Sequence, residues 1–152
     1  MNLLDFTNGE ILLKATKITQ SDIISFSELT KDRNKIHIDY DYGKKTLFAS
    51  SVAHGLFTLS ILFGQMFEQG LFDMHTIILS EIDKLKFLSP VFPGDSIYGK
   101  LNPIESYPSK TGKGTYLLVK VTGIVRNRSD REFVTLETKF LILKSNITEN
   151  IL

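Results

Sequence analysis

In the second half of the chain, apolar residues alternate with polar ones along several segments. The alternation is clearest at Val134, Leu136, Phe140 and Ile142. A period of two places alternate side chains on one face of a strand. The strands predicted on this basis lie at about 76–87, 95–105, 115–126 and 132–143. Because only short turns separate them, these strands are expected to pair antiparallel.

Residues 52–67 form the longest apolar stretch, and their apolar side chains cover every side of a helix. A helix that is hydrophobic all round must be enclosed by other elements. The stretch therefore predicts a core helix, which we expect to end near Gly70. Its sixteen residues fall short of the ~20 that span a bilayer, so no membrane partner is expected.

The first third of the chain predicts a short strand and a helix, followed by a long polar segment. The strand is expected around Ile11–Ile18, and the helix extends from a cap at Ser21 to about Leu29. From Thr30 to Ser51 the apolar residues show no regular period, and Asp, Asn, Lys and Gly are spread through the segment. Such a composition is typical of a loop.

Together these elements predict an α+β fold in which about five antiparallel strands wrap one long central helix. No repeat, low-complexity tract or linker rich in Pro, Gly or Ser divides the chain. We therefore expect a single domain over residues 1–152, with its core at 10–143 and a short polar tail at 144–152. A chain of this length can bury roughly two-thirds of its unfolded surface.

Charge and composition exclude several classes of function. The chain has 18 Lys+Arg against 17 Asp+Glu and a net charge of +1, which supplies no field to hold a polyanion, so no nucleic-acid partner is expected. It contains no cysteine, which removes disulfides, thiolate metal sites and Cys nucleophiles. That absence is compatible with a reducing cytosol, and the N-terminal residues lack the pattern of a secretory signal. A cytoplasmic location is therefore expected.

Asp32, Asn34 and His37 are the first candidates for chemistry. Asp32 and His37 are five residues apart, so they would point about 140° apart on a helix and to opposite faces of a strand. Only a turn brings them together. A carboxylate and an imidazole that converge could position a water and exchange protons with it near neutral pH. The alternative, which spacing alone favours, is an exposed Asx turn followed by a surface histidine.

His54 and Gly55, at the start of the predicted core helix, are the second candidate. Backbone N–H groups in the first turn of a helix have no intrahelical partner, and the helix dipole adds partial positive charge there. Because Gly55 has no Cβ, a ligand can approach its N–H, and one such oxyanion donor is worth roughly 3 kcal/mol. The alternative is that Gly55 only relieves crowding between helix and sheet, and that His54 is a half-buried histidine with satisfied hydrogen bonds.

Metal and phosphate sites receive little support. His37, His54 and His75 lack the helical or short-loop spacing that gathers metal ligands, so no metal is expected. One turn near the C-terminus carries three arginines: Arg126, Arg128 and Arg131. They could contact the phosphates of a carrier, but a solvated turn is the simpler interpretation.

Three motifs together resemble the MaoC-like hotdog family of (R)-specific enoyl-CoA hydratases and 3-hydroxyacyl dehydratases. They are Asp-Arg-Asn-Lys-Ile-His at 32–37, His-Gly-Leu at 54–56 and Phe-Leu-Ser-Pro-Val-Phe-Pro-Gly-Asp at 87–95. In that family, Asp-x-Asn-x-x-His is the hydratase signature and His-Gly begins the central helix. The resemblance spans residues 10–143 and implies a single hotdog domain. A hotdog subunit requires the same order of elements that the periodicity predicts.

The resemblance implies a hydro-lyase. Asp32 and His37 would activate one water for addition to C3 of a trans-2-enoyl thioester, or run the reverse elimination from an (R)-3-hydroxyacyl thioester. The Gly55 N–H would meet the thioester oxygen as enolate charge develops, with Asn34 and His54 in support. Which of Asp32 and His37 takes the proton stays open, because such a pair can titrate as one unit.

The family also implies the partners. The substrate would be an acyl-CoA or acyl-carrier-protein thioester, and no cofactor is expected beyond the CoA or phosphopantetheine that the substrate itself carries. A homodimer is expected, in which two sheets join edge to edge and the acyl tunnel lies at the subunit contact. The acyl chain length, the carrier and the pathway stay open.

Three positions depart from the family pattern. Lys31 stands where a small residue or Gly usually precedes the Asp, and Lys35 stands where Pro usually follows the Asn. Phe63 replaces a Ser that some members have nine positions after the helix His. These changes keep open a non-catalytic acyl-thioester-binding subunit. A hotdog thioesterase is a further alternative, although hydrolysis attacks the carbonyl carbon and calls for a different arrangement from the Asp-x-Asn-x-x-His run.

Overall fold

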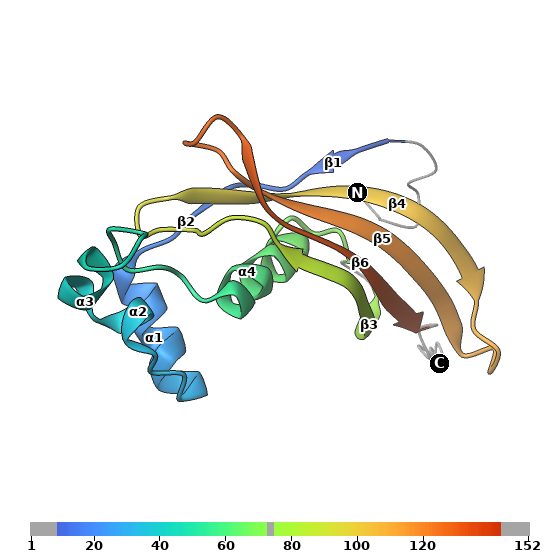
Figure 1. Cartoon of the computed structure of the whole chain (residues 1–152). Coiled ribbons are helices and arrows are strands. Elements are labelled where there is room, and N and C mark those ends of the chain that lie inside the picture. Colours follow the sequence, from blue (N-terminus) through green and yellow to red (C-terminus); the bar gives the residue numbers. More distant parts are fainter. Residues whose placement is uncertain (1–8, 73–74, 144–152) are drawn as a thin grey trace, which may run out of the picture.

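A computed structural model of the chain describes residues 9–72 and 75–143 and shows a curved antiparallel sheet with a long helix on its concave side (Figure 1). The six strands lie in the order β1-β4-β5-β6-β3, with β2 also paired to β4. They are β1 (Ile11–Leu12), β2 (Thr16–Lys17), β3 (Thr76–Phe87), β4 (Ser96–Pro108), β5 (Gly114–Val125) and β6 (Arg131–Leu143). The helices are α1 (Gln20–Thr30), α2 (Lys35–Ile38), α3 (Tyr40–Lys44) and α4 (Gly55–Glu68). The predicted α+β architecture is confirmed.

The strands fall close to where the alternation predicts them, except at the N-terminal end. The strand expected around Ile11–Ile18 is split into β1 and β2, because Lys14 donates its N–H to the Gln69 side chain at 2.9 Å. The register against β4 shifts by one residue across this break, since Leu12 pairs with Lys100 and Thr16 with Ile97. This break raises the expected five strands to six.

The cap of α1 differs from the prediction, because Thr19 and not Ser21 precedes the first helical residue. The Thr19 side chain accepts a hydrogen bond from the Asp22 N–H at 3.1 Å, and the Asp22 carboxylate accepts one from the Thr19 N–H at 2.9 Å. This reciprocal pair is a capping box, which requires an acidic or amide side chain three residues after the cap. Asp22 meets that requirement for Thr19.

The segment predicted as an irregular loop contains two short helices, so that prediction is wrong in part. Asn34 caps α2 by accepting from the Ile36 N–H at 3.3 Å, and Asp39 caps α3 by accepting from the Tyr42 N–H at 2.9 Å. The helices have only 4 and 5 residues. Elements this short complete little more than one turn, so no helical period can develop in the sequence.

Helix α4 is tied to the sheet on one face and open on another. Leu62 and Met66 are fully buried, and the buried Gln65 side chain donates to the Ile97 carbonyl at 3.0 Å. Leu56 and Phe67, in contrast, are 62% and 53% exposed. The prediction that α4 is covered on every side is therefore wrong for the single chain, although its start and end agree with the sequence.

Two expectations concern the ends of the chain and the membrane. The polar tail expected at 144–152 lies outside the described residues. The longest helix, α4, has 14 residues. Within 9–72 and 75–143, none of the helices combines the length and apolarity that a membrane crossing requires.

Candidate active site

A tight turn after α1 places Asp32. Helix α1 ends at Thr30, and the next residue, Lys31, caps it with a left-handed backbone of φ 67° and ψ 7°. The Asp32 N–H then donates to Thr30 Oγ1 at 3.3 Å, and Asp32 Oδ1 accepts from the Asn34 N–H at 3.3 Å. The Asx turn that was one alternative is thus present, with Asp32 exposed.

His37, on α2, is anchored to the segment that precedes α4. Its Nδ1 lies 2.6 Å from the Val52 carbonyl oxygen, and the Val52 N–H donates to the Ile36 carbonyl at 3.0 Å. A carbonyl oxygen only accepts hydrogen bonds, so Nδ1 carries the proton and Nε2 of neutral His37 keeps its lone pair. His37 is therefore a partly buried imidazole with one nitrogen available for proton exchange.

His54, immediately before α4, is buried rather than half-buried, with 3% of its surface exposed. Its Nε2 lies 3.1 Å from Ser27 Oγ and 3.2 Å from the Asp32 carbonyl oxygen. Burial lowers the pKa of His54 below its usual 6.5, and the neighbouring His37 lowers this pKa further, against the opposing effect of the Asp32 carbonyl. The ring stacks on that of His37, with centroids 3.7 Å apart and planes at 29°.

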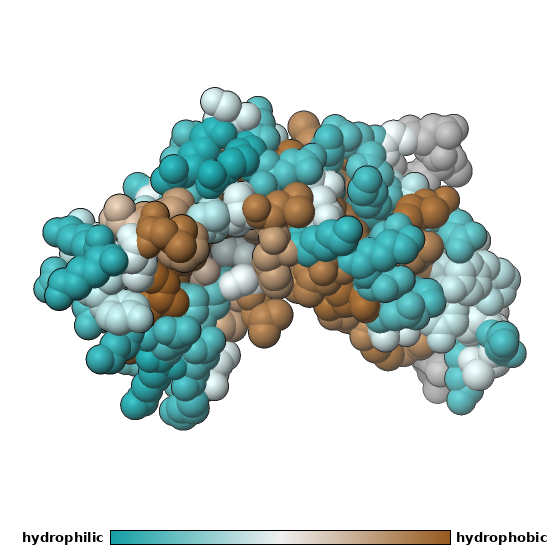
Figure 2. All heavy atoms as spheres, viewed as in Figure 1, coloured by the Kyte–Doolittle hydropathy of each residue, from teal (hydrophilic) through white to brown (hydrophobic). Residues whose placement is uncertain are grey.

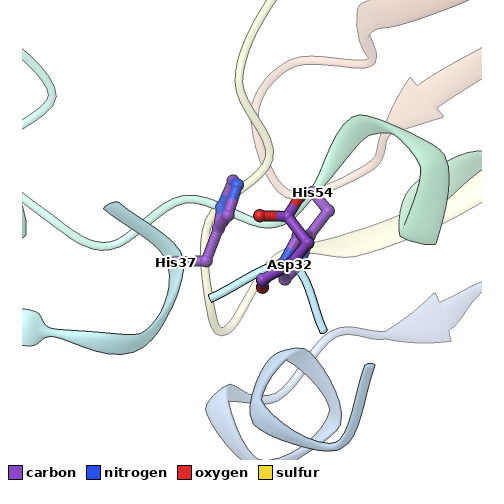
Figure 3. Close-up of side chains that lie close together, drawn as sticks. All are labelled: Asp32, His37 and His54. Atoms are coloured by element: carbon purple, nitrogen blue, oxygen red, sulfur yellow. The ribbon is translucent and has the colours of Figure 1, made fainter. Parts of the chain in front are cut away.

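Asp32, His37 and His54 thus converge, as Figure 3 shows. Each contributes one nitrogen or oxygen atom to a group whose members lie within 4.8 Å of one another. The argument from spacing, that the histidines do not gather, fails for His37 and His54, because the turn at Asp32 and the docking of α2 bring distant residues together. One nitrogen of each ring, Nδ1 of His37 and Nε2 of His54, already contacts a backbone carbonyl. The arrangement suits proton exchange better than metal ligation.

Gly55 is the first residue of α4 and lines a cavity of about 510 Å³. The cavity walls are mainly apolar and include the rings of Phe48, Phe87 and Phe133. A Cβ on Gly55 would lie 2.8 Å from the Phe87 ring, so Gly55 does relieve crowding between helix and sheet. Its N–H nevertheless lacks an intrahelical acceptor because of its position at the helix start. The two interpretations of Gly55 are compatible.

Val52 connects this cavity with the side chains around Asp32. Residue Val52 lines the cavity, while its carbonyl oxygen accepts the hydrogen bond from His37 Nδ1. Asp32 and His37 are not among the residues that line the cavity. Val52 is therefore a shared element of the cavity wall and of the anchor of His37.

The three departures from the family pattern occupy different places. Lys31 has the left-handed backbone that favours glycine, and Lys35 is the first residue of α2, where proline is favoured. Phe63 packs edge-on against Phe140, with ring centroids 5.9 Å apart. It lies nine residues along α4 from His54, roughly 13 Å at 1.5 Å per residue. Within one chain, Phe63 is thus remote from the Asp32 carboxylate.

The arginine-rich turn and the 87–95 motif have structural contacts. Arg128 Nε donates to Asp95 Oδ1 at 2.8 Å, and Asp95 Oδ2 accepts from the Phe92 N–H at 2.9 Å. Asp95 is 1% exposed. Arg131 donates to the Pro90 carbonyl at 3.1 Å. These contacts fasten the turn between β3 and β4, while Arg128 and Arg131 stay exposed, as the interpretation of a solvated turn requires.

Sequence reasoning missed the residues that hold the candidate site in place. Gln20 donates to the His37 carbonyl at 2.9 Å and accepts from Ser51 Oγ at 2.6 Å. Ser27 contacts His54, and Val52 anchors His37. No local signal marks these residues, because several of the contacts use backbone atoms that every residue type has.

Comparison with known proteins places the chain in a family. Residues 7–122 match the MaoC like domain. The chain is 33% identical over 101 residues to 3-hydroxybutyryl-CoA dehydratase of Methylorubrum extorquens, a match that covers 66% of this chain and 61% of that protein. It is 28% identical over 106 residues to (R)-specific enoyl-CoA hydratase of Rhodospirillum rubrum, covering 70% of this chain and 72% of that protein.

A solved structure shows the same fold. R-hydratase PhaJ1 from Pseudomonas aeruginosa, in the unliganded form, has a TM-score of 0.76 at 19% identity, over 92% of this chain and 83% of that one. At this identity the likeness concerns the fold, and it confirms the hotdog arrangement that the sequence predicts. Because the family match extends over most of the 152 residues and includes the 32–37 and 54–56 motifs, the chain belongs to the MaoC like domain family.

Proposed function

We propose that this chain is a hydro-lyase acting on acyl thioesters. It would add water to trans-2-enoyl thioesters as an (R)-specific hydratase, or dehydrate (R)-3-hydroxyacyl thioesters, carried on CoA or on acyl carrier protein. Support comes from the family and from relatives named as a dehydratase and a hydratase of CoA thioesters. Within the chain, the observation that carries the proposal is the anchored His37, whose imidazole has a ring nitrogen within 4.8 Å of a carboxylate oxygen of Asp32.

Asp32 and His37 would hold one water between them. As the water oxygen bonds to C3, a proton leaves the water for one member of the pair, and C2 receives a proton. The elements of water are added and nothing is oxidised or reduced, so the reaction needs no cofactor beyond the CoA or phosphopantetheine of the substrate. Either side chain of the pair could accept this proton.

Gly55 and the cavity would receive the rest of the substrate. The Gly55 N–H, at the positive end of the α4 dipole, is placed to stabilise the thioester oxygen as enolate charge develops. The apolar cavity suits an acyl chain. Asn34 would support the reaction by capping α2, which carries His37.

The absence of cysteine and the class of substrate favour a cytoplasmic location.

A homodimer is part of the proposal. Among the described strands, β3 pairs only with β6, and it exposes Ile78, Leu79, Ile82, Leu85 and Phe87. Figure 2 shows apolar side chains gathered beneath the arch of the sheet, over α4 and β3. A long apolar edge strand invites pairing, and a two-fold axis would let two copies pair through β3. Phe87 also lines the cavity, so the second copy would border the substrate site.

Crotonyl-CoA tests the proposed activity. Loss of the enoyl thioester absorbance without release of free thiol would support hydration, and the Asp32→Asn variant serves as the control. Release of thiol would instead identify a thioesterase. No change with thioesters of several chain lengths would favour a non-catalytic acyl-binding subunit. The (R) assignment fails if a dehydrogenase specific for (S)-3-hydroxyacyl-CoA oxidises the product.

A further inference from the structure

His54 is a buried, titratable side chain. The proposed reaction transfers protons through Asp32 and His37 and does not use His54. Its Nδ1 is the one buried side-chain nitrogen or oxygen within residues 9–72 and 75–143 that has no hydrogen-bond partner. Its Nε2, in contrast, contacts two groups, Ser27 Oγ and the Asp32 carbonyl. Such an unequal environment for the two ring nitrogens constrains the protonation state of the ring.

The Asp32 carbonyl determines which nitrogen carries the proton. A carbonyl oxygen can only accept, so the proton must be on Nε2 of His54, and Nδ1 keeps a lone pair. A second proton on Nδ1 would bury both a charge and a donor without an acceptor, and both are costly. Burial also lowers the pKa of His54. Both the missing acceptor and the lowered pKa favour the neutral form of His54.

The neutral ring of His54 contacts both members of the proposed catalytic pair. One contact is the stack on His37, with centroids 3.7 Å apart. The other is the hydrogen bond from Nε2 to the carbonyl of Asp32, the residue that also bears the carboxylate. Phe26 adds a further ring contact at 5.0 Å. The titratable groups that face His54 are Asp32 and His37, since Phe26 and Ser27 of α1 do not titrate.

We propose that His54 is a positioning residue, a neutral Nε2–H imidazole that orients the His37 ring by stacking and holds the Asp32 turn by a hydrogen bond. It transfers no proton itself. This role explains why a histidine occupies a buried place without using its second nitrogen. Its kinetic consequence depends on the proposed hydro-lyase activity, whereas its tautomer and contacts do not.

Two substitutions separate the two contacts. His54→Gln keeps an amide donor near the position of Nε2 but removes the ring, and His54→Phe keeps a ring but removes the donor. We expect each to lower kcat about 10- to 100-fold, because a misplacement of about 1 Å can cost 10²-fold. KM should change less than about twofold, since neither contact touches the substrate. Gly64→Ala, farther along α4, is the control, because a Cβ there meets nothing within 4 Å and both contacts of His54 remain; its kcat should stay within about threefold of the wild type.

Nitrogen NMR of the imidazole rings in the full chain provides a measurement that needs no substrate. The His54 ring should remain the neutral Nε2–H tautomer as the pH falls through 6.5, the ordinary pKa of a histidine. Titration of His54 at its ordinary pKa, or a proton on its Nδ1, would overturn the proposal. So would wild-type kcat in folded His54→Gln and His54→Phe. If the wild type hydrates no thioester, the proposed function fails. The NMR measurement of the His54 tautomer still tests the inference in that case, because it does not depend on activity.

Discussion

Asp32 and His37 are fixed by different means. The Asp32 carboxylate is exposed and is held by a backbone N–H of its own turn, whereas His37 is clamped through Nδ1 to the distant Val52. Neither side chain belongs to the apolar core. Substitution of either should therefore affect chemistry more than folding.

The first prediction concerns this pair. Asp32→Asn and His37→Ala should each lower turnover of an enoyl thioester by about 10²- to 10⁴-fold, which is the range that a positioned acid or base contributes. The thermal unfolding midpoint should change little, because the core is intact. Absorbance assays and thermal melts measure the two effects. Near wild-type rates in both variants would reject the assignment of the site.

Gly55 and Gly64, both on α4, allow a matched comparison. A Cβ at Gly55 would lie 2.8 Å from the Phe87 ring, whereas a Cβ at Gly64 meets nothing within 4 Å. Gly55→Ala keeps the backbone N–H but should push the Phe87 ring into the cavity and lower kcat/KM by about 10- to 100-fold, because a misplacement of about 1 Å can cost 10²-fold. Gly64→Ala should leave kcat/KM unchanged and stabilise the helix by about 0.5–1 kcal/mol. Equal losses of activity would show that Gly55 has no special role.

The lowered pKa of His54 also predicts a dependence of stability on pH. The folded pKa lies below the usual 6.5, so at lower pH the unfolded chain binds a proton more readily than the folded chain. This contribution to stability is complete above about pH 6.5 and is lost as the pH falls towards the folded pKa. Urea unfolding between pH 7 and 5 should show a steeper decline for the wild type than for His54→Gln. Parallel declines would contradict the prediction.

At the scale of elements, α2 depends on its first two residues. Asn34 caps the helix with a ψ of 128°, which lies in the range that a residue before proline adopts. Lys35 is the first helical residue, where an N–H has no intrahelical acceptor. The backbone is thus already suited to the proline that the family usually has at this position.

Lys35→Pro should stabilise the fold by about 0.4–1 kcal/mol, because proline reduces the freedom of the unfolded chain at no cost to the folded one. Activity should be retained, since His37 keeps its place. Ile36→Pro is the control, because the Ile36 N–H donates to Asn34 Oδ1 and its loss should destabilise the turn. Chemical denaturation curves compare the variants. Destabilisation by Lys35→Pro would mean that the turn differs from the one described.

For the whole molecule, the exposed edge of β3 predicts the assembly. The chain of 17.2 kDa should elute at twice this mass in light-scattering chromatography. Ile78→Lys, at the edge, should shift it towards the monomer, because a charged edge opposes pairing. Ile104→Lys on β4 is the matched control, since Ile104 is also about half exposed and its strand lies between β1 and β5. A monomeric wild type would rule out the proposed dimer.

The sequence by itself determined the elements whose patterns are local and long. The alternation is clearest in β5, as at Val119 and Val121, and in β6, as at Val134 and Leu136. Helix α4 contains enough apolar residues to mark it as a core helix. The Asp-x-Asn-x-x-His and His-Gly motifs identified Asp32, His37, His54 and Gly55 as candidates. The sequence pattern did not predict the short helices α2 and α3, because four or five residues complete too few turns to show a helical period.

Only the tertiary structure decided how the candidates meet. The anchor of His37 is the backbone carbonyl of Val52, fifteen residues away, and the partner of His54 is the carbonyl of Asp32, twenty-two residues away. Every residue type has a backbone carbonyl, so the sequence pattern does not indicate which carbonyl accepts these hydrogen bonds. Stacking of two rings and the shape of a cavity likewise depend on packing between elements, which local periodicity does not encode.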